Sequence, residues 1–413
     1  MKVVGIIAEY NPFHNGHKYH MEQAKALTGA DRIVVVMSGN YTQRGNPALI
    51  DKYARAEMAL MNGADLVLEL PLYYACTSAE YFAKGAVILL DKLGIVDTLC
   101  FGSECGDISI LSKIADALCH PSDNFDNILT LYLKSGKTFP QARALALEES
   151  IPDLYAHTAI LSSPNNILGI EYMKALILRN SKIVPYTNLR VGAAYHEKRL
   201  QEHNSSAIAI RHSLADHHDL RLIEDQVPPS VYAIMQKHFN YNFPIFTDDL
   251  SSLLHYKLLL DAPAGYTDYI DVSEDLSARI LNRLHEYKDF SSFCERLKTK
   301  EMTYARISRC LLHILLNIRK DRLSSFLNED AIFYARMLGF RKEATALLSL
   351  IKQHSSIPLI SKLADAYKII DSTTGLAMLE EEISASHIYN TIINTKYHYS
   401  VPNEYSQNII IIP

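Results

Sequence analysis

The sequence lacks the features that would place it in a membrane or make it depend on disulfides. No apolar run approaches the roughly 18 residues of a bilayer span. The opening residues, MKVVGIIAEYN, have no small-residue cleavage site and are better explained as a buried strand. The six cysteines form no C-x-x-C pair, so neither a zinc knuckle nor a dithiol redox site is indicated. We therefore expect a cytoplasmic protein with reduced cysteines and no membrane contact.

The chain also lacks an excess of positive charge. A net charge of −5 argues against a surface covered in basic patches, although it leaves room for a local one. With 48% hydrophobic and 21% charged residues, the composition is that of an ordinary globular protein. A length of 413 residues is enough for two or three domains with a full core.

In the first half of the chain, continuous apolar runs alternate with stretches of helical periodicity. Such alternation predicts an α/β fold with a parallel, Rossmann-like sheet covered on both faces. Ligands bind such sheets at the carboxyl ends of the strands, near the topological switch point. The predicted strands are KVVGIIA, RIVVVMSG, ADLVLELP, DTLCFGSE and SKIVPYTN, and the predicted helices span residues 17–27, 51–61, 78–93 and 107–119.

The second half carries different signals. From about residue 240 the strand patterns fade, and helical periodicity predominates. The runs that indicate helices are HYKLLL, SARILNRLHEY, SRCLLHILLNI and AIFYARMLGF. The polar, Pro-containing region 225–249 is the predicted boundary, which gives a ligand-binding domain at 1–239 and a mainly α-helical domain at 240–413.

The stretch NPFHNGH, directly after the first predicted strand, is the strongest candidate for chemistry. A glycine turn between a strand and a helix directs backbone N–H groups and the helix dipole toward one point, which favours a phosphate. His14 and His17, flanking Gly16, would add donors that stabilise charge on a transferring phosphate. The alternative is that the two histidines only cap the helix or bind a structural metal, since H-x-x-H is common by chance.

This stretch resembles the H-x-G-H signature of the nucleotidyltransferase superfamily, which is related to the HIGH motif of class I aminoacyl-tRNA synthetases. The superfamily's second signature, I-S-S-T-x-I-R, has a counterpart in SAIAIR, Ser206 to Arg211. Ile208 stands where that pattern has threonine, so Ser206 and backbone amides would replace the missing hydroxyl donor. The resemblance implies that ATP phosphates lie between His14, His17 and Arg211.

A larger set of segments resembles one bacterial family, the tRNA(Met) cytidine acetate ligases. Those segments are NPFHNGH, SGNYTQRGNPA, ELPLYYACTSAEYFAKGAV, LCFGSE, SPNNILGIEY and KTKEMTYARISRCLLHILLNI. The resemblance implies an ATP-dependent ligase that converts acetate to acetyl-adenylate and pyrophosphate. The acetyl group then passes to N4 of the wobble cytidine of elongator tRNA(Met), which lies in a single-stranded loop and can be splayed out.

The resemblance also implies which residues bind ATP, with His14 and His17 as the catalytic pair. Gly102 would let the nucleotide approach the backbone, Asn165 would hydrogen-bond it, and Arg190 would reach the nucleotide or its phosphates. On residue chemistry alone, Asn165 is equally a helix cap after Pro164. The full predicted ATP set is Ile7, Ala8, Glu9, Tyr10, Asn11, Pro12, Phe13, His14, Asn15, Gly16, His17, Lys18, Tyr19, His20, Gly102, Asn165, Arg190, Ser206 and Arg211. No carboxylate cluster looks like a dedicated metal cage, so we expect Mg²⁺ to enter with ATP.

A basic segment in the second half is the candidate RNA surface. Residues 279–322 contain eleven basic and five acidic residues within a chain of net charge −5, which is typical of a surface that follows a phosphate backbone. An equally good alternative is a solvated helix face with paired charges. The predicted RNA contacts are Arg44, Lys52, Arg55, Lys298, Lys300, Arg306 and Arg309.

Three classes of function remain open from the sequence. The first is the tRNA acetate ligase, the second a small-molecule adenylyltransferase of cofactor metabolism, and the third a non-catalytic RNA-binding protein on a nucleotidyltransferase fold. The basic helical half favours the first over the second, because a small substrate needs no such appendage. The intact set of His14, Gly16 and His17 favours it over the third. The oligomeric state stays open, with a homodimer as one alternative.

Overall fold

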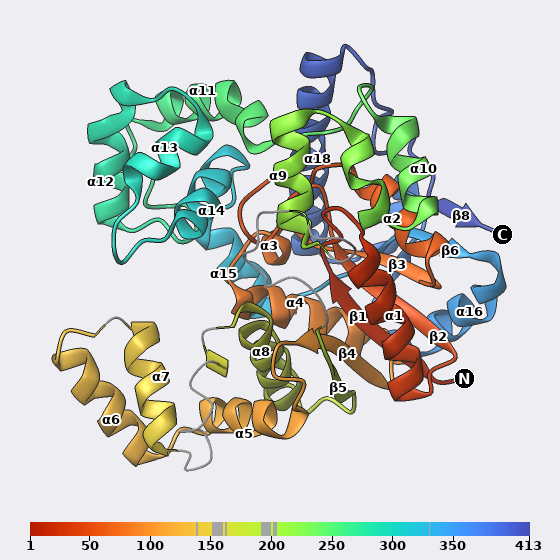
Figure 1. Cartoon of the computed structure of the whole chain (residues 1–413), viewed down its shortest axis with the longest axis horizontal. Coiled ribbons are helices and arrows are strands. Elements are labelled where there is room, and N and C mark those ends of the chain that lie inside the picture. The colour runs from red at the N-terminus through yellow and green to blue at the C-terminus, as the bar shows by residue number, and fades with distance from the viewer. Residues whose placement is uncertain (138, 151–159, 162, 191–199, 201–204, 330) are drawn as a thin grey trace.

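One mixed β-sheet runs through the centre of the molecule (Figure 1). The computed structural model describes residues 1–137, 139–150, 160–161, 163–190, 200, 205–329 and 331–413. The strand order is β5-β4-β1-β2-β3-β6-β7, with β8 also paired to β6. The strands are β1 Val3–Ala8, β2 Arg32–Ser38, β3 Leu66–Leu70, β4 Thr98–Ser103, β5 Val184–Leu189, β6 Ala335–Arg341, β7 Leu359–Ile360 and β8 Ile410–Ile412. The five strands predicted from the first half are all confirmed, and they are mutually parallel.

Burial on both faces explains why these strands are continuous apolar runs. Along β2, Val34 and Val36 point into one hydrophobic core, while Ile33 and Val35 point into the other. Successive side chains of a strand point to opposite faces, so a sheet covered on both sides needs apolar residues at every position. The two cores therefore account for the absence of apolar–polar alternation in the sequence.

Helices cover both faces of the sheet. The core on one face includes residues of α1, α2, α9 and α10, and the core on the other includes residues of α3, α4, α5 and α8. The helices up to residue 238 are α1 Asn15–Thr28, α2 Lys52–Met61, α3 Leu72–Ala75, α4 Ala79–Lys92, α5 Ile108–Cys119, α6 Asp123–Lys134, α7 Phe139–Ser150, α8 Pro164–Leu178, α9 Ala207–His217 and α10 Pro229–His238. Of these, α6 and α7 project from the sheet as a hairpin (Figure 1). The 3₁₀ helices among the described residues include η2 Leu220–Gln226, η3 Thr247–Leu250, η4 Leu284–Glu286, η5 Lys342–Ala344 and η6 Leu363–Asp365.

The second half begins with a separate group of helices and then returns to the sheet. We call residues 251–315 the helical unit; it contains α11 to α14 and lies to one side of the sheet (Figure 1). The helices of this half are α11 Ser251–Asp261, α12 Glu274–Arg283, α13 Phe290–Leu297, α14 Tyr304–Leu315, α15 Lys320–Glu329, α16 Thr345–His354, α17 Ala366–Ile369 and α18 Thr373–Tyr397. Among the described residues, no helix is both long and apolar enough to cross a bilayer.

One predicted helix is wrong, and it alters the domain picture. The run AIFYARMLGF forms strand β6, which pairs antiparallel with β3 between Leu66 and Phe340 and between Glu69 and Arg336. A short apolar run is equally compatible with a buried strand and a buried helix, because both bury every side chain. Residues 335–412 thus contribute strands to the sheet begun by residues 3–70, so the predicted, mainly α-helical region 240–413 shares this sheet with region 1–239.

The order of the strands locates a binding region. From β1 the chain moves to β2 and β3 on one side, while β4 and β5 lie on the other. The strand order therefore reverses between β1 and β4, and a crevice opens at their carboxyl ends. The segments that begin there are the loop to α1, the loop 39–51 after β2, and the residues after β4 and β5.

Candidate functional site

A cavity of about 230 Å³ lies at this switch point. Its walls come from the carboxyl ends of β1, β4 and β5, the N-terminal turns of α1 and α9, and the loop after β2. Polar and apolar side chains share the lining. The lining residues are Ile7, Ala8, Glu9, Tyr10, Asn11, His14, Gly16, His17, Tyr19, His20, Thr42, Gln43, Arg44, Asn46, Phe82, Phe101, Gly102, Asn165, Leu168, Tyr172, Asn188, Arg190, Ser205, Ser206, Ala207, Ile208 and Arg211.

His14 and His17 close the first turn of α1 with a reciprocal pair of hydrogen bonds. Gly16 N–H donates to Nδ1 of His14 (3.1 Å), and His14 N–H donates to Nδ1 of His17 (3.2 Å). Because both Nδ1 atoms accept, the hydrogen of each neutral ring is on Nε2. The cap that was considered as an alternative is thus present, and it leaves each Nε2–H as a donor for a ligand.

Burial keeps both imidazoles neutral. It lowers the pKa of His14 to about 3, with smaller contributions from the charges of Arg190 and Arg211. Burial also lowers the pKa of His17 well below its ordinary value, and the charges of His14, Arg190 and His20 lower this pKa further. The site therefore presents the two predicted donors as neutral N–H groups beside the amides of a helix N-terminus.

Gly16 leaves room for the imidazole ring of His14. A Cβ atom at this position would lie 2.9 Å from Cε1 and 3.1 Å from Nδ1 of His14. Any larger residue would displace the His14 ring and break its bond to the N–H of residue 16. The glycine of the motif therefore serves the cap as much as it serves a ligand.

A second helix N-terminus faces the same cavity. Ser206 caps α9 by accepting the N–H of Ala209 (3.2 Å), and residues 205–208 line the cavity. Arg211, one turn further on, donates from a terminal guanidinium nitrogen to the carbonyl of Asn11 (2.5 Å). Two helix dipoles and a guanidinium thus converge on one space, an arrangement suited to several phosphate charges.

Glu104 positions the segment of α8 that contains Asn165, one of the residues predicted by resemblance to bind the nucleotide. Its Oε1 accepts the side-chain Nδ2 of Asn165 (2.6 Å), and its Oε2 accepts the backbone N–H of Asn166 (2.9 Å). The Oδ1 of Asn165 in turn accepts a bond from Arg190 (3.4 Å). At Gly102, a Cβ atom would lie 3.1 Å from Cγ of Arg190. The cap of α8 is Ser163 rather than Asn165, whose amide faces the cavity.

Four predicted ATP residues do not line the cavity. Phe13 is fully buried and packs against Tyr10 and His17, with ring centroids 4.9 and 5.5 Å away. Asn15 donates to the carbonyl of Asp225 (2.8 Å), and neither residue lines the cavity. The four residues are Pro12, Phe13, Asn15 and Lys18. They belong to the contiguous stretch 7–20, and position in a stretch does not determine which way a side chain points.

The comparisons with known proteins agree with this geometry. The model of the HIGH Nucleotidyl Transferase family matches residues 1–404. The chain belongs to this family. A tRNA(Met) cytidine acetate ligase of Alkaliphilus metalliredigens is 40% identical over 399 residues, covering 94% of both chains. Another, from Caldicellulosiruptor saccharolyticus, is 40% identical over 419 residues and covers 100% of this chain and 99% of its own.

Solved structures of Thermotoga maritima TmcAL are also similar. The apo form superposes with a TM-score of 0.94 at 32% identity, and the coverage is 100% of both chains. A second form, bound with alpha-thio ATP, gives a TM-score of 0.92 with the same identity and coverage. The similarity extends over the whole molecule, including the helical unit that lies outside the sheet.

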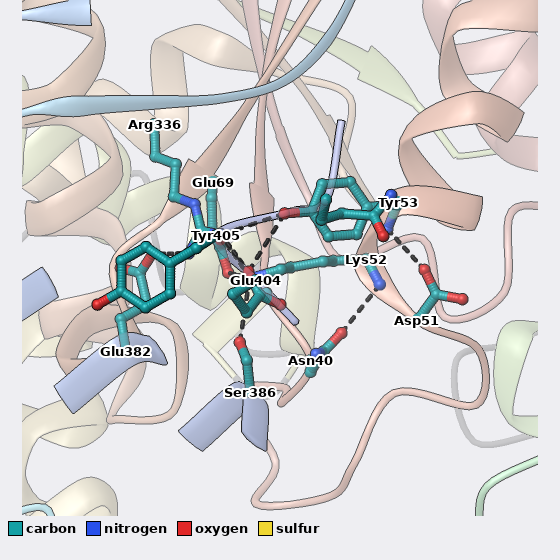
Figure 2. A network of polar contacts seen from close by, with 12 residues as sticks. Asn40, Asp51, Lys52, Tyr53, Glu69, Arg336, Glu382, Ser386, Glu404 and Tyr405 are labelled. Carbon is teal, nitrogen blue, oxygen red and sulfur yellow. Dashed lines mark hydrogen bonds and ion pairs between the residues drawn. The ribbon is translucent and has the colours of Figure 1, made fainter. Parts of the chain in front are cut away.

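In this HIGH nucleotidyl transferase, two of the predicted RNA contacts are buried structural cations. The ammonium group of Lys52 lies 3.0 Å from both carboxylate oxygens of Glu69 and 3.2 Å from Glu404. Figure 2 draws these side chains in one polar network. Both Lys52 and Arg55 are 0% exposed. The guanidinium of Arg55 donates to the carbonyls of four residues, Glu9, Ser38, Gly39 and Ile50. The prediction that these two residues contact RNA is wrong, because a sequence shows their charge but not their burial.

The cluster around Lys52 joins distant parts of the chain. Arg336 on β6 pairs with Glu69, Glu382 and Glu404 (Figure 2). Burial and then the charge of Glu69 raise the pKa of Glu382 to about 8, whereas the charges of Lys52 and Arg336 overcome burial and lower that of Glu404 to about 2. With Glu382 protonated, the two cations Lys52 and Arg336 balance the two carboxylates Glu69 and Glu404. This balance offsets the desolvation cost of burying the charges.

The basic segment is exposed in part and paired in part. Lys298, Lys300 and Arg306 are exposed, while Arg309 is half-buried with its Nε 3.5 Å from Asp271. Four cations of the segment, Lys298 among them, pair with acids, as the solvated-face alternative supposed: Arg279 with Asp275, Arg296 with Glu286, Lys298 with Glu295, and Arg319 with Asp268. RNA contact by this segment stays a prediction. Arg44 lies elsewhere, half-buried in the cavity wall.

The loop after β2 connects the cavity to the helical unit. At one end, Gln43 N–H donates to Oε1 of Glu9 (2.7 Å). At the other, Ser308 of α14 donates to the carbonyl of Gly45 (2.9 Å) and lies 3.3 Å from Oδ1 of Asn46. The motif SGNYTQRGNPA is thus a bridge whose residues Thr42, Gln43, Arg44 and Asn46 also line the cavity.

Several lining residues were absent from the predicted set. They are Thr42, Gln43, Asn46, Phe82, Phe101, Leu168, Tyr172, Asn188, Ser205, Ala207 and Ile208. A signal for some existed, because the segments SGNYTQRGNPA, LCFGSE and SPNNILGIEY, which contain several of them, are among those that resemble the ligase family. Among the described residues, no group of three histidine, cysteine, aspartate or glutamate side chains is placed to hold a metal ion.

Proposed function

We propose that this chain is an ATP-dependent ligase that activates acetate as acetyl-adenylate and transfers the acetyl group to N4 of the wobble cytidine of elongator tRNA(Met). Relatives that are about 40% identical over nearly the whole length carry the name tRNA(Met) cytidine acetate ligase. The observation that carries the proposal is the convergence of the α1 and α9 N-termini with His14, His17 and Arg211 on one cavity.

In the first step, a carboxylate oxygen of acetate attacks the α-phosphorus of ATP, and the bond to the bridging oxygen of pyrophosphate breaks. Acetate is already a nucleophile, so this step needs no general base. The site contributes donors instead: the amides of two helix N-termini, the guanidinium of Arg211, and the Nε2–H groups of His14 and His17. These groups stabilise the charge that builds on the phosphate oxygens, which is the main catalytic requirement of phosphoryl and nucleotidyl transfer.

Mg²⁺ fits this scheme as a companion of ATP. Among the described residues, the cavity wall offers nitrogen donors and a single carboxylate, so the phosphate oxygens themselves are the best available ligands for the ion. When bound, it would neutralise charge on the pyrophosphate leaving group. The protein's contribution is to hold the triphosphate in line with acetate.

In the second step, the cytidine N4 amine attacks the acetyl carbon, and the bond to the adenylate oxygen breaks to release AMP. The target base must be unstacked and brought to the cavity, which is feasible at modest cost for an anticodon-loop nucleotide. The exposed side chains of Lys298, Lys300 and Arg306 on the helical unit, together with Arg44 at the cavity, are the proposed contacts to the tRNA backbone.

The decisive experiment has two parts. Purified protein is tested for acetate-dependent exchange of label between pyrophosphate and ATP, and then for N4-acetylcytidine in an elongator tRNA(Met) transcript. We expect both activities, with no exchange when acetate is omitted. Exchange without tRNA acetylation would favour an adenylyltransferase with a small acceptor, and the absence of both would favour a non-catalytic RNA-binding protein.

A further inference from the structure

Glu9 is chemically unlike the rest of the cavity wall. Among the described lining residues it is the only carboxylic acid, whereas the charged or donating side chains around it include His14, His17, Arg190 and Arg211. Those donors suit phosphates, and an acid does not. The cavity therefore has a place for a group that donates hydrogen bonds or gains positive charge.

The position of Glu9 is fixed from two sides. Its backbone carbonyl accepts a bond from the buried guanidinium of Arg55 (2.6 Å), and its Oε1 accepts the N–H of Gln43 (2.7 Å). The second carboxylate oxygen, Oε2, has no hydrogen-bond partner among the described residues. A group held by backbone and side-chain bonds with one oxygen left over is preorganised for a ligand.

The surroundings of Glu9 identify the corner of the cavity in which it lies. Tyr172 lines the same cavity, and the negative charge of Glu9 contributes, after burial, to raising the pKa of the Tyr172 hydroxyl and of the Cys76 thiol. Phe82 also lines the cavity. From Gln43 the loop continues to Gly45, which accepts a bond from Ser308 of the helical unit. Glu9 is therefore connected through one short loop to the part of the molecule proposed to hold the RNA.

Of the substrates in the proposed reaction, the cytidine amine and the amino and hydroxyl groups of adenosine can donate to this carboxylate, and of these only the cytidine amine loses a proton in the reaction. ATP phosphates and acetate are anions that Glu9 would repel. The exocyclic amine carries two N–H donors and no acceptor, and its nitrogen gains positive charge as it attacks the acetyl carbon. A neighbouring carboxylate both orients the amine and stabilises that charge.

We propose that Glu9 is a catalytic residue of the second step, which accepts a proton from the N4 amine of the target cytidine. The N4 lone pair forms the bond to the acetyl carbon, and the bond from that carbon to the phosphate oxygen of adenylate breaks, with its electron pair leaving on AMP. One N4 proton passes to Oε2 of Glu9 and then to water. This inference rests on the proposed function and assigns a base that the first step does not need.

Glu9→Gln is the test variant, because glutamine keeps an oxygen for the N–H of Gln43 while it removes the proton acceptor. Glu22→Gln, an exposed position on α1, is the matched control. Three rates are compared for each protein: acetate-dependent pyrophosphate exchange, trapping of acetyl-adenylate by hydroxylamine, and single-turnover acetyl transfer to tRNA. Hydroxylamine is a strong nucleophile that needs no base, so it separates formation of the intermediate from its use.

We expect Glu9→Gln to slow transfer to tRNA at least about 100-fold more than it slows exchange or hydroxylamine trapping, the usual minimum for loss of a general base. Glu22→Gln should change no ratio. Transfer within threefold of the wild type would overturn the inference. An equal fall in all three rates, or a weaker ATP affinity that accounts for the loss, would also overturn it, because Glu9 would then serve the nucleotide or the fold. If the wild-type protein lacks acetate-dependent exchange, the proposed function itself fails, and that result is visible without any variant.

Discussion

The imidazole rings of His14 and His17 are stacked, with 3.7 Å between their centroids and 26° between their planes. Each ring uses its Nδ1 to accept a backbone N–H of the α1 N-terminus. Two protonated rings at this distance would repel each other, so the stack depends on their neutrality. This dependence has consequences for stability, catalysis and pH.

The free energy of unfolding should fall at acid pH, because these two imidazole rings must become protonated. The pKa of His14 is about 3 in the folded state and ordinarily 6.5, so the stability that its neutral ring contributes is present above pH 6.5 and is lost as the pH falls toward 3. At pH 5 the loss from this one group is about 2 kcal/mol. Denaturant unfolding at pH 7 and pH 5 measures it. His14→Asn, which keeps an N-cap side chain, should show a smaller loss, and an unchanged pH dependence in that variant would contradict the assignment.

His17 should be separable into a structural and a chemical role. His17→Gln keeps an acceptor at the third helical position, as in an ordinary capping box, but removes the ring N–H. His17→Ala removes both. We expect either change to reduce acetate-dependent pyrophosphate exchange at least about 100-fold, while only the alanine variant loses roughly 1 kcal/mol of stability. Near-normal exchange in either variant would remove His17 from the catalytic pair.

Gly45 should tolerate no side chain. Its φ is +79°, and a Cβ atom would lie 2.4 Å from the backbone nitrogen of Arg309. Gly29 is a control with a similar φ of +64° but open space around it. Gly29→Ala should cost about 1 kcal/mol from backbone strain alone. Gly45→Ala should cost more and also lower tRNA acetylation, because the helical unit must shift relative to the loop. Equal thermal stability of the two variants would show that the contact with α14 is loose.

Replacing Lys298, Lys300 and Arg306 by glutamine should affect the reaction only when RNA is present. These side chains are exposed on the helical unit, away from the cavity. If all three contact phosphates, the slope of log K against log salt for tRNA binding should fall by about three units. A triple glutamine variant of the exposed Lys352, Lys362 and Lys368 is the charge-matched control. The same slope in both variants would make residues 298–306 an ordinary solvated surface.

Alkaline pH should weaken the buried cluster around Lys52. Burial and Glu69 raise the pKa of Glu382 to about 8 from an ordinary 4.5. The stability linked to its protonated form is therefore present below pH 4.5 and is lost as the pH rises through 8, at no more than about 1.4 kcal/mol per pH unit. Glu382→Gln, which imitates the protonated acid, should flatten the pH dependence of unfolding between pH 6 and 9. A variant that retains the full slope would show that another group titrates.

The sequence was sufficient for the parallel part of the sheet and for the centre of the site. The first five strands are β-branched runs with helices between them, and the residues at their carboxyl ends had to meet at one edge. His14, Gly16 and His17 were recognisable because glycine and histidine in this order have a physical use at a helix N-terminus.

What the sequence does not contain is the direction and burial of individual side chains. Lys52 and Arg55 carry the charge of an RNA contact, yet the tertiary structure surrounds them with carboxylates and carbonyls. Phe101 and Tyr172, separated by 71 positions, meet at 5.6 Å between ring centroids only because β4 and α8 pack together. Strand β6 was missed because its neighbour, β3, lies in a distant part of the chain.

The pairing of β3 with β6 also sets the order in which the protein can mature on the ribosome. Until residues 335–341 have been translated, β3 presents its unpaired N–H and C=O groups as an open edge, and Glu69 has not met Arg336. An exposed sheet edge of this kind invites association with other nascent chains. The residues proposed to bind ATP are synthesised early, but the sheet that supports them is closed only by the last fifth of the polypeptide. A chain released before residue 335 would therefore keep an unpaired sheet edge and tend to aggregate. The complete sheet can form only after residues 335–341 have been synthesised.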